Sequence, residues 1–322
     1  MTKKYDVVAL GELLIDFTMN GESGQGNPLF EANPGGAPCN VLAMLQKLGK
    51  RTAFIGKVGN DMFGKMLEER AGSTGIDLKG LKKDDEVHTT LAFVQTFPDG
   101  DRDFSFYRNP GADMMLREEE IEEELIQDTR IFHFGTLSMT DPVVEKATKK
   151  AIAIAKEKGC ILSFDPNLRP PLWSSLEKAK EMIAYGMSVC DILKISDNEI
   201  EFMTGKTDID EGISEIRDKY NIPLIFATLG KEGSRAYYQD IRAEAAGFVN
   251  PNTIETTGAG DTFCACELNY VLEHGLEGLT QENLKELLTF ANAAASIITT
   301  RKGALCVMPE KEEILSFLEK TL

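Results

Sequence analysis

The sequence predicts an α/β fold in which helices cover both faces of a central, mainly parallel sheet, with a small second sheet beside it. Short apolar runs alternate with segments of helical length through most of the 322 residues. Runs that are apolar throughout are typical of parallel strands, which are buried on both faces. Two β-rich runs joined by a turn signal predict the second sheet. We expect one domain that spans residues 1–322.

The strands of the main sheet follow from the apolar runs. Four apolar residues predict the first strand at 7–10, which ends at Gly11. A helix is predicted over 40–48 and is closed by Gly49, and a strand follows at 52–58. Later strands, with helical regions between them, are predicted at 131–134, 161–164, 192–195 and 224–227.

The second sheet is predicted from the segments 88–97 and 102–108, which are rich in β-forming residues. They flank Pro98-Asp99-Gly100-Asp101, and Asp-Gly between two such runs is a hairpin signal. With a strand at about 12–18, this hairpin of residues 88–108 makes a small sheet inserted in the domain. Such a sheet serves as a lid over a site, or is an edge hairpin without function, and the pattern does not decide between the two.

The charge and hydropathy of the chain exclude several classes of protein. The net charge is −17, whereas nucleic acids and anionic membranes are bound by basic surfaces. No apolar run approaches the roughly 20 residues that span a bilayer. The N-terminal residues 1–6 lack the apolar core of a signal peptide. We therefore expect a cytoplasmic protein with no nucleic-acid or membrane partner.

One common nucleotide-binding motif is nearly present, and another is absent. Residues 59–65 fit G-x-x-x-x-G-K, but a P-loop needs Ser or Thr next, to hold magnesium, and this chain has Met66 there. No G-x-G-x-x-G follows the first strand, so a dinucleotide-binding site has little support. Neither a P-loop NTPase nor an NAD-linked oxidoreductase is predicted.

A stronger candidate for phosphate chemistry is Thr-Thr-Gly-Ala-Gly-Asp at 256–261, which precedes a helical pattern over 262–274. Small residues let the backbone approach a ligand, and a helix start offers free N–H groups and a positive dipole end. The amides of residues 258–261 are therefore suited to bind phosphate oxygens as charge builds during transfer. Asp261, in the first turn, is suited to take the proton of an attacking hydroxyl. The alternative is an ordinary glycine turn whose aspartate complements the helix dipole.

Two further segments are suited to bind a hydroxyl-rich ligand. Gly35 and Gly36 stand ahead of a predicted helix and allow close backbone approach, and the Asn40 side chain is both donor and acceptor. Asp16 follows a strand end and offers two acceptor oxygens for neighbouring hydroxyls. Taken singly, each segment is better explained as a turn or a helix cap.

Together, these segments resemble the two signatures of the PfkB (ribokinase-like) carbohydrate kinases. Residues 56–64 resemble the family's G-x-x-G-x-D-x-x-G segment, residues 198–201 its N-x-x-E motif, and residues 228–233 its nucleotide-side glycine turn. The resemblance extends from about residue 6 to residue 309. Any one motif is weak, but their order and spacing together are specific.

The resemblance implies a ribokinase-like fold, with a sugar held between the body and the lid and ATP along the sheet edge. Asp261 would be the base, and the amides of Gly258, Ala259 and Gly260 the anion hole. Magnesium would be organised by Asn198 and Glu201, mostly through water. The implied sugar-binding residues are Asp16, Gly35, Gly36 and Asn40, and those near the nucleotide are Thr228, Gly230, Gly233 and Asn292.

Within the family, residues 106–113 and 165–169 look most like bacterial fructokinases, which implies that D-fructose is converted to fructose 6-phosphate. Arg169 would stabilise the transferring phosphoryl group, because guanidinium matches phosphate geometry. Arg108 would contact the sugar, or is a surface arginine. Ketodeoxygluconate kinases and aminoimidazole riboside kinases resemble this pattern too. From another class, a non-catalytic interaction protein with the same fold remains an alternative.

One departure from the family concerns a monovalent cation. The family usually has Asp six residues before the catalytic aspartate, where it helps bind the cation, and this chain has Glu255. Because a carboxylate is kept and Thr257 is in place, we expect potassium to activate. The resemblance leaves the oligomeric state open, but exposed strand edges of the lid would allow two chains to pair.

Overall fold

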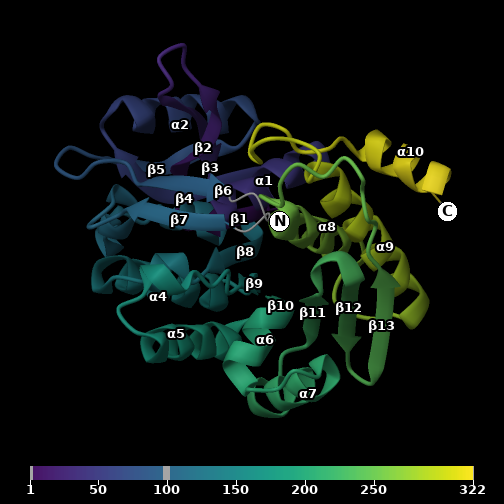
Figure 1. Ribbon diagram of the computed structural model, residues 1–322. Helices are drawn as coiled ribbons and strands as arrows, with labels where there is room; N and C mark the ends of the chain where they lie inside the picture. The colour runs from purple at the N-terminus through teal and green to yellow at the C-terminus, as the bar shows by residue number, and fades with distance from the viewer. Residues whose placement is uncertain (1–2, 97–101, 322) are drawn as a thin grey trace.

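The computed structural model describes residues 3–96 and 102–321. Its largest element is a nine-stranded sheet in the order β13-β12-β11-β10-β9-β8-β1-β4-β5, in which β12 is antiparallel to both β11 and β13 and the other neighbours are parallel (Figure 1). The strands are β1 Tyr5–Leu10, β4 Thr52–Gly59, β5 Asp77–Asp84, β8 Thr129–Gly135, β9 Ile161–Asp165, β10 Ile192–Ser196, β11 Leu224–Thr228, β12 Gly233–Tyr238 and β13 Ile241–Ala246.

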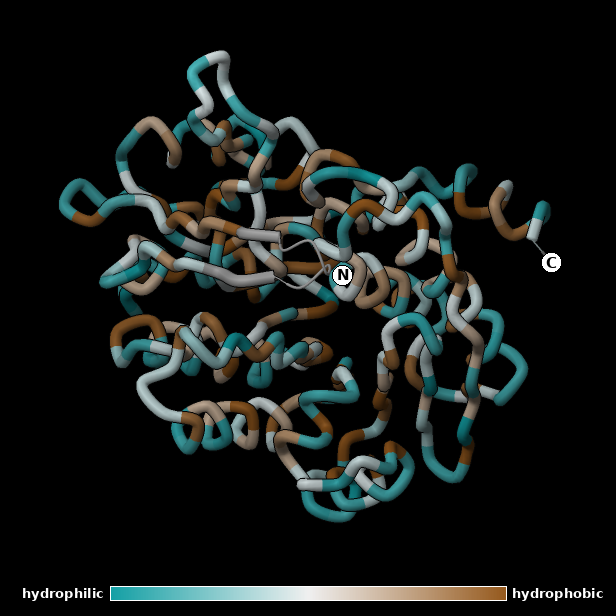
Figure 2. The backbone as a smooth tube through the Cα atoms, in the orientation of Figure 1, coloured by the Kyte–Doolittle hydropathy of each residue, from teal (hydrophilic) through white to brown (hydrophobic). Residues whose placement is uncertain are grey.

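Helices cover both faces of this sheet, because successive residues of each buried strand point to opposite faces. On β1, Val7 and Ala9 pack in the core with α1, α8 and α9, while Val8 and Leu10 pack in the core with α4 and α5. The apolar central strands stand out in Figure 2. The helices are α1 Ala37–Lys47, α2 Met62–Ser73, α3 Glu123–Gln127, α4 Pro142–Glu157, α5 Leu176–Val189, α6 Asp197–Thr204, α7 Ile209–Tyr220, α8 Ala259–His274, α9 Gln281–Ile298 and α10 Lys311–Thr321.

The predicted main sheet is confirmed, since each apolar run named above forms a strand in it. The predicted helix over 40–48 begins earlier, at Ala37, because Pro38 is tolerated in a first turn, where its missing N–H costs no hydrogen bond. None of the helices within residues 3–96 and 102–321 is long and apolar enough to cross a membrane.

The predicted small sheet is also confirmed, with four strands in the order β3-β2-β6-β7. The hairpin is antiparallel as expected, although its turn at 98–101 lies outside the described residues. No strand was predicted at β3, whose sequence contains Pro28 and Pro34. β3 is an edge strand, where proline is tolerated. The strands are β2 Leu14–Glu22, β3 Pro28–Gly35, β6 Leu91–Thr96 and β7 Arg102–Tyr107.

The two faces of this lid sheet differ in chemistry. Asp16 and Asn33, which are register partners, lie on the face toward the body. On the other face the rings of Phe17 and Phe93 stack with centroids 4.8 Å apart, while Phe30 and Tyr107 are 44% and 66% exposed. The pairing of two chains through the lid stays a prediction, which sedimentation velocity at several protein concentrations would test.

One acidic side chain of α8 is buried in the interior of the protein. Glu267 of α8 is fully buried, and neither carboxylate oxygen has a hydrogen-bond partner among the described residues. Burial raises the pKa of Glu267 well above its ordinary value, and the charge of Lys194 opposes this only in part. The side chain is therefore held as the neutral acid, because a buried charge without a partner is expensive.

We predict that Glu267→Leu raises the free energy of unfolding by about 1–3 kcal/mol at pH 7, since it removes an unpartnered polar group of similar volume. The folded state binds this proton more tightly than the unfolded state, so wild-type stability falls as pH rises above the ordinary glutamate pKa. The advantage of the variant should therefore grow from pH 5 to pH 8. Urea titrations at several pH values measure it.

Glu267→Gln is the matched control, because it removes the ionisable group but keeps an unpartnered polar one. It should lose the pH dependence and gain less stability than Glu267→Leu. A Leu variant less stable than wild type across this pH range would show that the carboxyl group has a stabilising partner.

Candidate functional site

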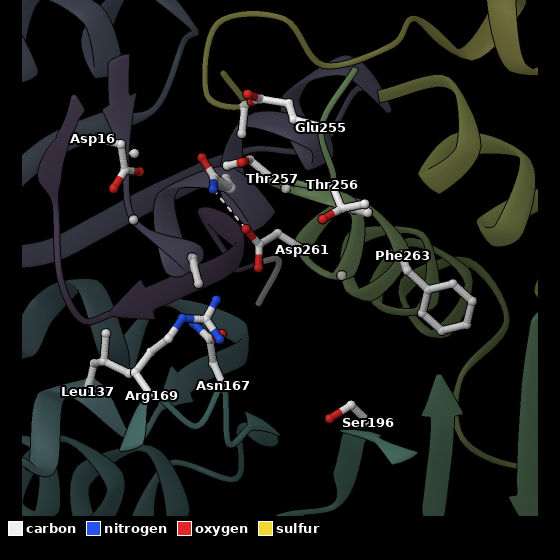
Figure 3. A pocket seen from close by; sticks show the side chains of 18 of the residues that line it. Asp16, Leu137, Asn167, Arg169, Ser196, Glu255, Thr256, Thr257, Asp261 and Phe263 are labelled. Carbon is white, nitrogen blue, oxygen red and sulfur yellow. Dashed lines mark hydrogen bonds between the residues drawn. The ribbon is translucent and has the colours of Figure 1, made fainter. Parts of the chain in front are cut away.

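A cleft of about 790 Å³ opens where the parallel strands of the main sheet reach their carboxyl ends, with the lid sheet over it. The carboxyl edge of an open α/β sheet is where such folds bind ligands. Lining residues come from β2 and β3 of the lid, from the loop after β9, from the start of α6 and from the start of α8. Segments far apart in the sequence therefore meet in one cavity (Figure 3).

The start of α8 gives the cleft an anion-binding end. Gly258 has φ +77°, and a β-carbon there would lie 2.6 Å from the side chain of Ala304, so only glycine fits. Among the described residues, the N–H groups of Gly258, Gly260 and Asp261 have no protein acceptor, and all three residues line the cleft. The N–H of Ala259 donates to the carbonyl of Thr256 at 3.3 Å. The anion hole predicted for 258–261 therefore has its free donors at Gly258, Gly260 and Asp261, with Ala259 closing the turn.

Asp261 faces the cavity from the first turn of α8 and is held in place by Asn40 of α1. The Asn40 Nδ2 donates to Asp261 Oδ2 at 2.8 Å, shown as the dashed line in Figure 3. Burial raises the pKa of Asp261 to about 6, against the Asn40 hydrogen bond and the charges of Lys194 and Arg169. A base with a pKa just below neutral is ionised at pH 7 and still able to accept a proton.

The predicted sugar-binding residues Asp16, Gly35, Gly36 and Asn40 all line the cleft on its lid side. A β-carbon on Gly35 would lie 2.5 Å from Asp16 Oδ2, so glycine makes room for that carboxylate. The Asn40 Oδ1 is buried with no partner among the described residues. Burial raises the pKa of Asp16 to about 7, and the charge of Arg169 opposes this. This pattern of open acceptors suits a ligand that presents several hydroxyl groups.

The structure separates the two predicted arginines. Arg169 lines the cleft on the loop after β9 and points toward Asp261 in Figure 3. Arg108 is buried outside the lining, where its guanidinium bonds Asp113 at 2.7 Å, Thr140 Oγ1 at 2.8 Å and the Leu137 carbonyl at 2.9 Å. The predicted sugar contact of Arg108 is therefore wrong, because its guanidinium is committed to anchoring the end of β7 to the body.

The predicted nucleotide-side residues Thr228, Gly230, Gly233 and Asn292 line the other half of the cleft. Asn292 also has a structural role. Its Oδ1 accepts from Ser234 Oγ at 3.0 Å, and its Nδ2 donates to the carbonyls of Ala245 and Ala246 at 3.1 Å. Asn292 thus fastens the β12–β13 hairpin to α9 beside the cavity.

Comparison with known proteins decides the family. The sequence model that describes the pfkB family of carbohydrate kinases matches residues 4–311 of this chain. The chain belongs to the pfkB family of carbohydrate kinases. Probable fructokinase-2 of Arabidopsis thaliana is 42% identical over 315 residues, which cover 97% of this chain and 95% of the relative. Fructokinase-2 of Solanum habrochaites is 40% identical over 315 residues, which cover 97% and 96%.

Solved structures agree with this family and with the ribokinase-like fold. A fructokinase with bound ATP from Xylella fastidiosa superposes with a TM-score of 0.88 at 29% identity, covering 98% of each chain. A double mutant of a fructokinase from Vibrio cholerae O395, in a form bound to fructose, ADP and potassium ion, superposes with a TM-score of 0.86 at 28% identity, covering 99% of this chain and 100% of that one.

The metal residues predicted for this pfkB kinase need a correction. Asn198 and Glu201 are exposed on α6 and are absent from the cleft lining, whereas Asp197 and Glu199 line it. The Glu199 carboxylate accepts from the N–H groups of Leu168 and Ser196, each at 2.8 Å. Ser-x-x-Glu at 196–199 is a capping-box pattern, and this signal in the sequence would have found Glu199.

The donor set fits a magnesium ion that arrives with a nucleotide. No group of three or more His, Cys, Asp or Glu residues gathers as a metal centre within residues 3–96 and 102–321. Magnesium keeps several waters and takes one or two carboxylates with substrate phosphates, rather than an all-protein cage. Asp197 and Glu199 supply such carboxylates on the nucleotide half of the cleft.

Glu255 and Thr257, the predicted monovalent-cation residues, also line the cleft. The Glu255 Oε1 accepts from the N–H of Gly303 at 2.8 Å, and the Glu255 N–H donates to the Thr299 carbonyl at 3.2 Å. These bonds tie the segment before α8 to the segment after α9.

Lys194 is a cleft residue that the sequence analysis passed over. It lines the cavity from β10, and its Nζ bonds Asp165 Oδ2 of β9 at 3.0 Å, with both side chains buried. A lysine inside the apolar run 192–195 was the signal, because lysine is rarely buried without a partner. Asn33 of β3 and Asn167 of the loop after β9 were not predicted as site residues, and both line the cavity.

We predict that Asp261→Asn keeps nucleotide affinity but lowers kcat by about 100-fold or more, because the amide cannot accept the proton. In wild type, kcat/KM should fall as pH drops through about 6, where Asp261 becomes protonated. Steady-state kinetics from pH 5 to pH 8, with calorimetry for the nucleotide, measure both effects. Turnover near wild type would remove Asp261 from the role of base.

We predict that Glu199→Gln raises the magnesium concentration needed for half-maximal rate by several-fold, because it weakens a carboxylate at the nucleotide end. Glu201→Gln is the matched control two residues away, and its magnesium titration should coincide with that of wild type because Glu201 faces solvent. Equal effects of the two substitutions would contradict the assignment.

Proposed function

We propose that this protein is a fructokinase, which transfers the γ-phosphoryl group of ATP to the primary hydroxyl of D-fructose and releases fructose 6-phosphate and ADP. The observation that carries the proposal is the Asp261 carboxylate, bonded to Asn40, beside the free N–H groups at the start of α8. The full-length similarity to proteins named fructokinases supports the choice of sugar.

In the proposed reaction, the Asp261 carboxylate accepts the proton of the attacking hydroxyl. That oxygen forms a bond to the γ-phosphorus, while the bond from the γ-phosphorus to the bridging oxygen breaks and ADP leaves. The N–H groups of Gly260 and Asp261 stabilise the charge on the transferring phosphoryl group. Arg169 faces the same place and adds a guanidinium, which matches phosphate oxygens.

The sugar half of the cleft supplies orientation. Asp16 and the unpartnered Oδ1 of Asn40 accept hydrogen bonds from the sugar hydroxyls, and Asn33 borders the same wall. A ligand that lacks one of these hydroxyls leaves a buried acceptor unpaired, which costs roughly 1–3 kcal/mol, or about 5- to 150-fold. The lid above the sugar excludes water, so the phosphoryl group goes to the sugar rather than to water.

Magnesium is expected with the nucleotide, at Asp197 and Glu199. When bound, it supplies charge neutralisation on the phosphate oxygens. Glu199 has a further part in the proposal. Since it accepts from the N–H of Leu168, it connects the nucleotide end of the cleft to the loop that carries Arg169.

An arginine in the sugar half of the cleft would favour a sugar acid, whose carboxylate it would bind, and Arg108 was the residue predicted to contact the sugar. Arg108 is buried in a bond network with Asp113 outside the cavity. The neutral ketose therefore stays as the proposed substrate.

We predict that D-fructose gives a higher kcat/KM than ribose, ketodeoxygluconate or aminoimidazole riboside, because it fills the acceptors on the lid wall as a neutral ligand. Arg108→Ala should lower the melting temperature and leave the order of preference unchanged, since Arg108 anchors the lid. A coupled assay for ADP across the four substrates measures this. Preference for ketodeoxygluconate that is lost in Arg108→Ala would overturn the fructose assignment.

We predict that potassium raises the rate relative to sodium, because Glu255 keeps a carboxylate bonded to Gly303 beside Thr257. The comparison is kcat with chloride salts of potassium, sodium and tetramethylammonium at one ionic strength. Glu255→Gln should remove the difference between the cations. Identical rates in the three salts would refute potassium activation.

A further inference from the structure

Lys194 carries a buried positive charge at the phosphoryl-transfer end of the cleft. It is the third residue of β10, and its side chain is 9% exposed while that of its partner Asp165 is 5% exposed. The bond from Nζ to Asp165 Oδ2 measures 3.0 Å. Burial alone would lower the pKa of Lys194, but the carboxylates of Asp165 and Glu199 reverse this and hold it above its ordinary value. The ammonium is therefore a permanent charge.

This charge lies close to the start of α8. A β-carbon on Gly260 would lie 3.1 Å from Lys194 Nζ, so the ammonium lies directly against the glycine turn that offers its free N–H to the cavity. Its charge also acts on Asp261, where it lowers the pKa. Lys194 thus lies against Gly260 of the anion-binding turn, and the proposed base Asp261 is the next residue of the same turn.

The stability of the fold does not require such a pair. Burying two charges costs several kcal/mol of desolvation each, and apolar replacements of buried ion pairs are often neutral or stabilising. A purely structural pair could also lie anywhere in the sheet. Lys57 forms one away from the cleft, with Asp84 at 3.0 Å and Glu120 at 2.9 Å. The Lys194 pair instead lies where negative charge builds during transfer.

We infer that Lys194 is a further positioning residue of the reaction: held by Asp165 against Gly260, its ammonium supports the anion-binding turn and keeps the Asp261 carboxylate ionised. This rests on the proposed function only in that Asp261 must be the base of a phosphoryl transfer. Lys194 acts through Gly260 and Asp261 and exchanges no proton with the sugar.

The test must remove the lysine charge without creating a new buried one. Lys194→Met alone would leave Asp165 buried and unpaired, so the informative comparison is between Asp165→Asn and the double variant Asp165→Asn/Lys194→Met. These two proteins differ only at residue 194, and in Asp165→Asn the Glu199 carboxylate still favours the charged form of Lys194. The charged and titratable groups that act on it are Asp165, Glu199, Asp261, Cys264, Glu267 and His133, and apart from Asp165 they are the same as in wild type.

When kcat/KM is plotted against pH, its acidic limb should lie at higher pH in the double variant than in Asp165→Asn. The reason is that Asp261 loses the nearby Lys194 charge, which favours its ionised form. The value of kcat should be about 10- to 100-fold lower, with the sugar KM within about 2-fold, as for loss of a group that acts on the transition state. Asp165→Asn/Lys194→Arg should recover part of the rate. Coincident profiles and equal kcat values in the Asn and Asn/Met variants would overturn the inference.

A second readout needs no sugar. ADP with aluminium fluoride mimics the transferring phosphoryl group, and calorimetry should show about 10-fold weaker binding to the double variant than to Asp165→Asn. Equal affinities would also count against the role. Lys57→Met is the matched control: it should lower the melting temperature and leave kcat and the acidic limb of the pH profile unchanged. If wild type phosphorylates another sugar, the proposed substrate fails, and the same comparison with that sugar still decides the role of Lys194.

Discussion

The site depends on keeping one carboxylate ionised in a cavity that is partly closed to water. Desolvation raises the pKa of Asp261 to about 6, and a modest further rise would leave it protonated at neutral pH. Three groups oppose that rise: the Asn40 amide, which donates at 2.8 Å, and the charges of Lys194 and Arg169. They come from α1, β10 and the loop after β9, so the ionisation state of one side chain depends on the assembly of the whole sheet.

The parallel topology explains how these groups meet. Every strand from β5 across to β11 runs in the same direction, so their carboxyl ends share one edge. The loop after β9 and the start of α6 therefore lie opposite α8, although α8 follows them by some 60 to 90 residues. The lid crosses the same edge because β2 leaves the sheet directly after β1. The anchoring of β7 by Arg108 and Asp113 fixes its other end.

The sequence predicted the parts that depend on local patterns. Apolar runs fix which segments become buried strands, and Thr256 to Asp261 shows its chemistry in its own residue types. What it could not predict depends on orientation. Asn198 and Glu201 fit a motif but lie on the solvent side of α6, while Glu199 is turned inward by its cap. Arg108 ends a lid strand, yet only the fold reveals Asp113 beside it. β3 was not predicted, and it tolerates its prolines because it is an edge strand.

The acidic composition of the chain is compatible with an anionic nucleotide because positive groups gather at one end of the cleft. Asp16 lines the cavity on its lid side, and Asp197 and Glu199 line the end where magnesium is proposed to arrive with the nucleotide. Lys194, Arg169 and the amino end of α8 collect on the phosphate half. A net charge of −17 acts mainly through solvent, which screens it over about 8 Å at physiological ionic strength. The buried ammonium of Lys194 is screened much less, so a few well-placed groups set the local potential that a nucleotide meets.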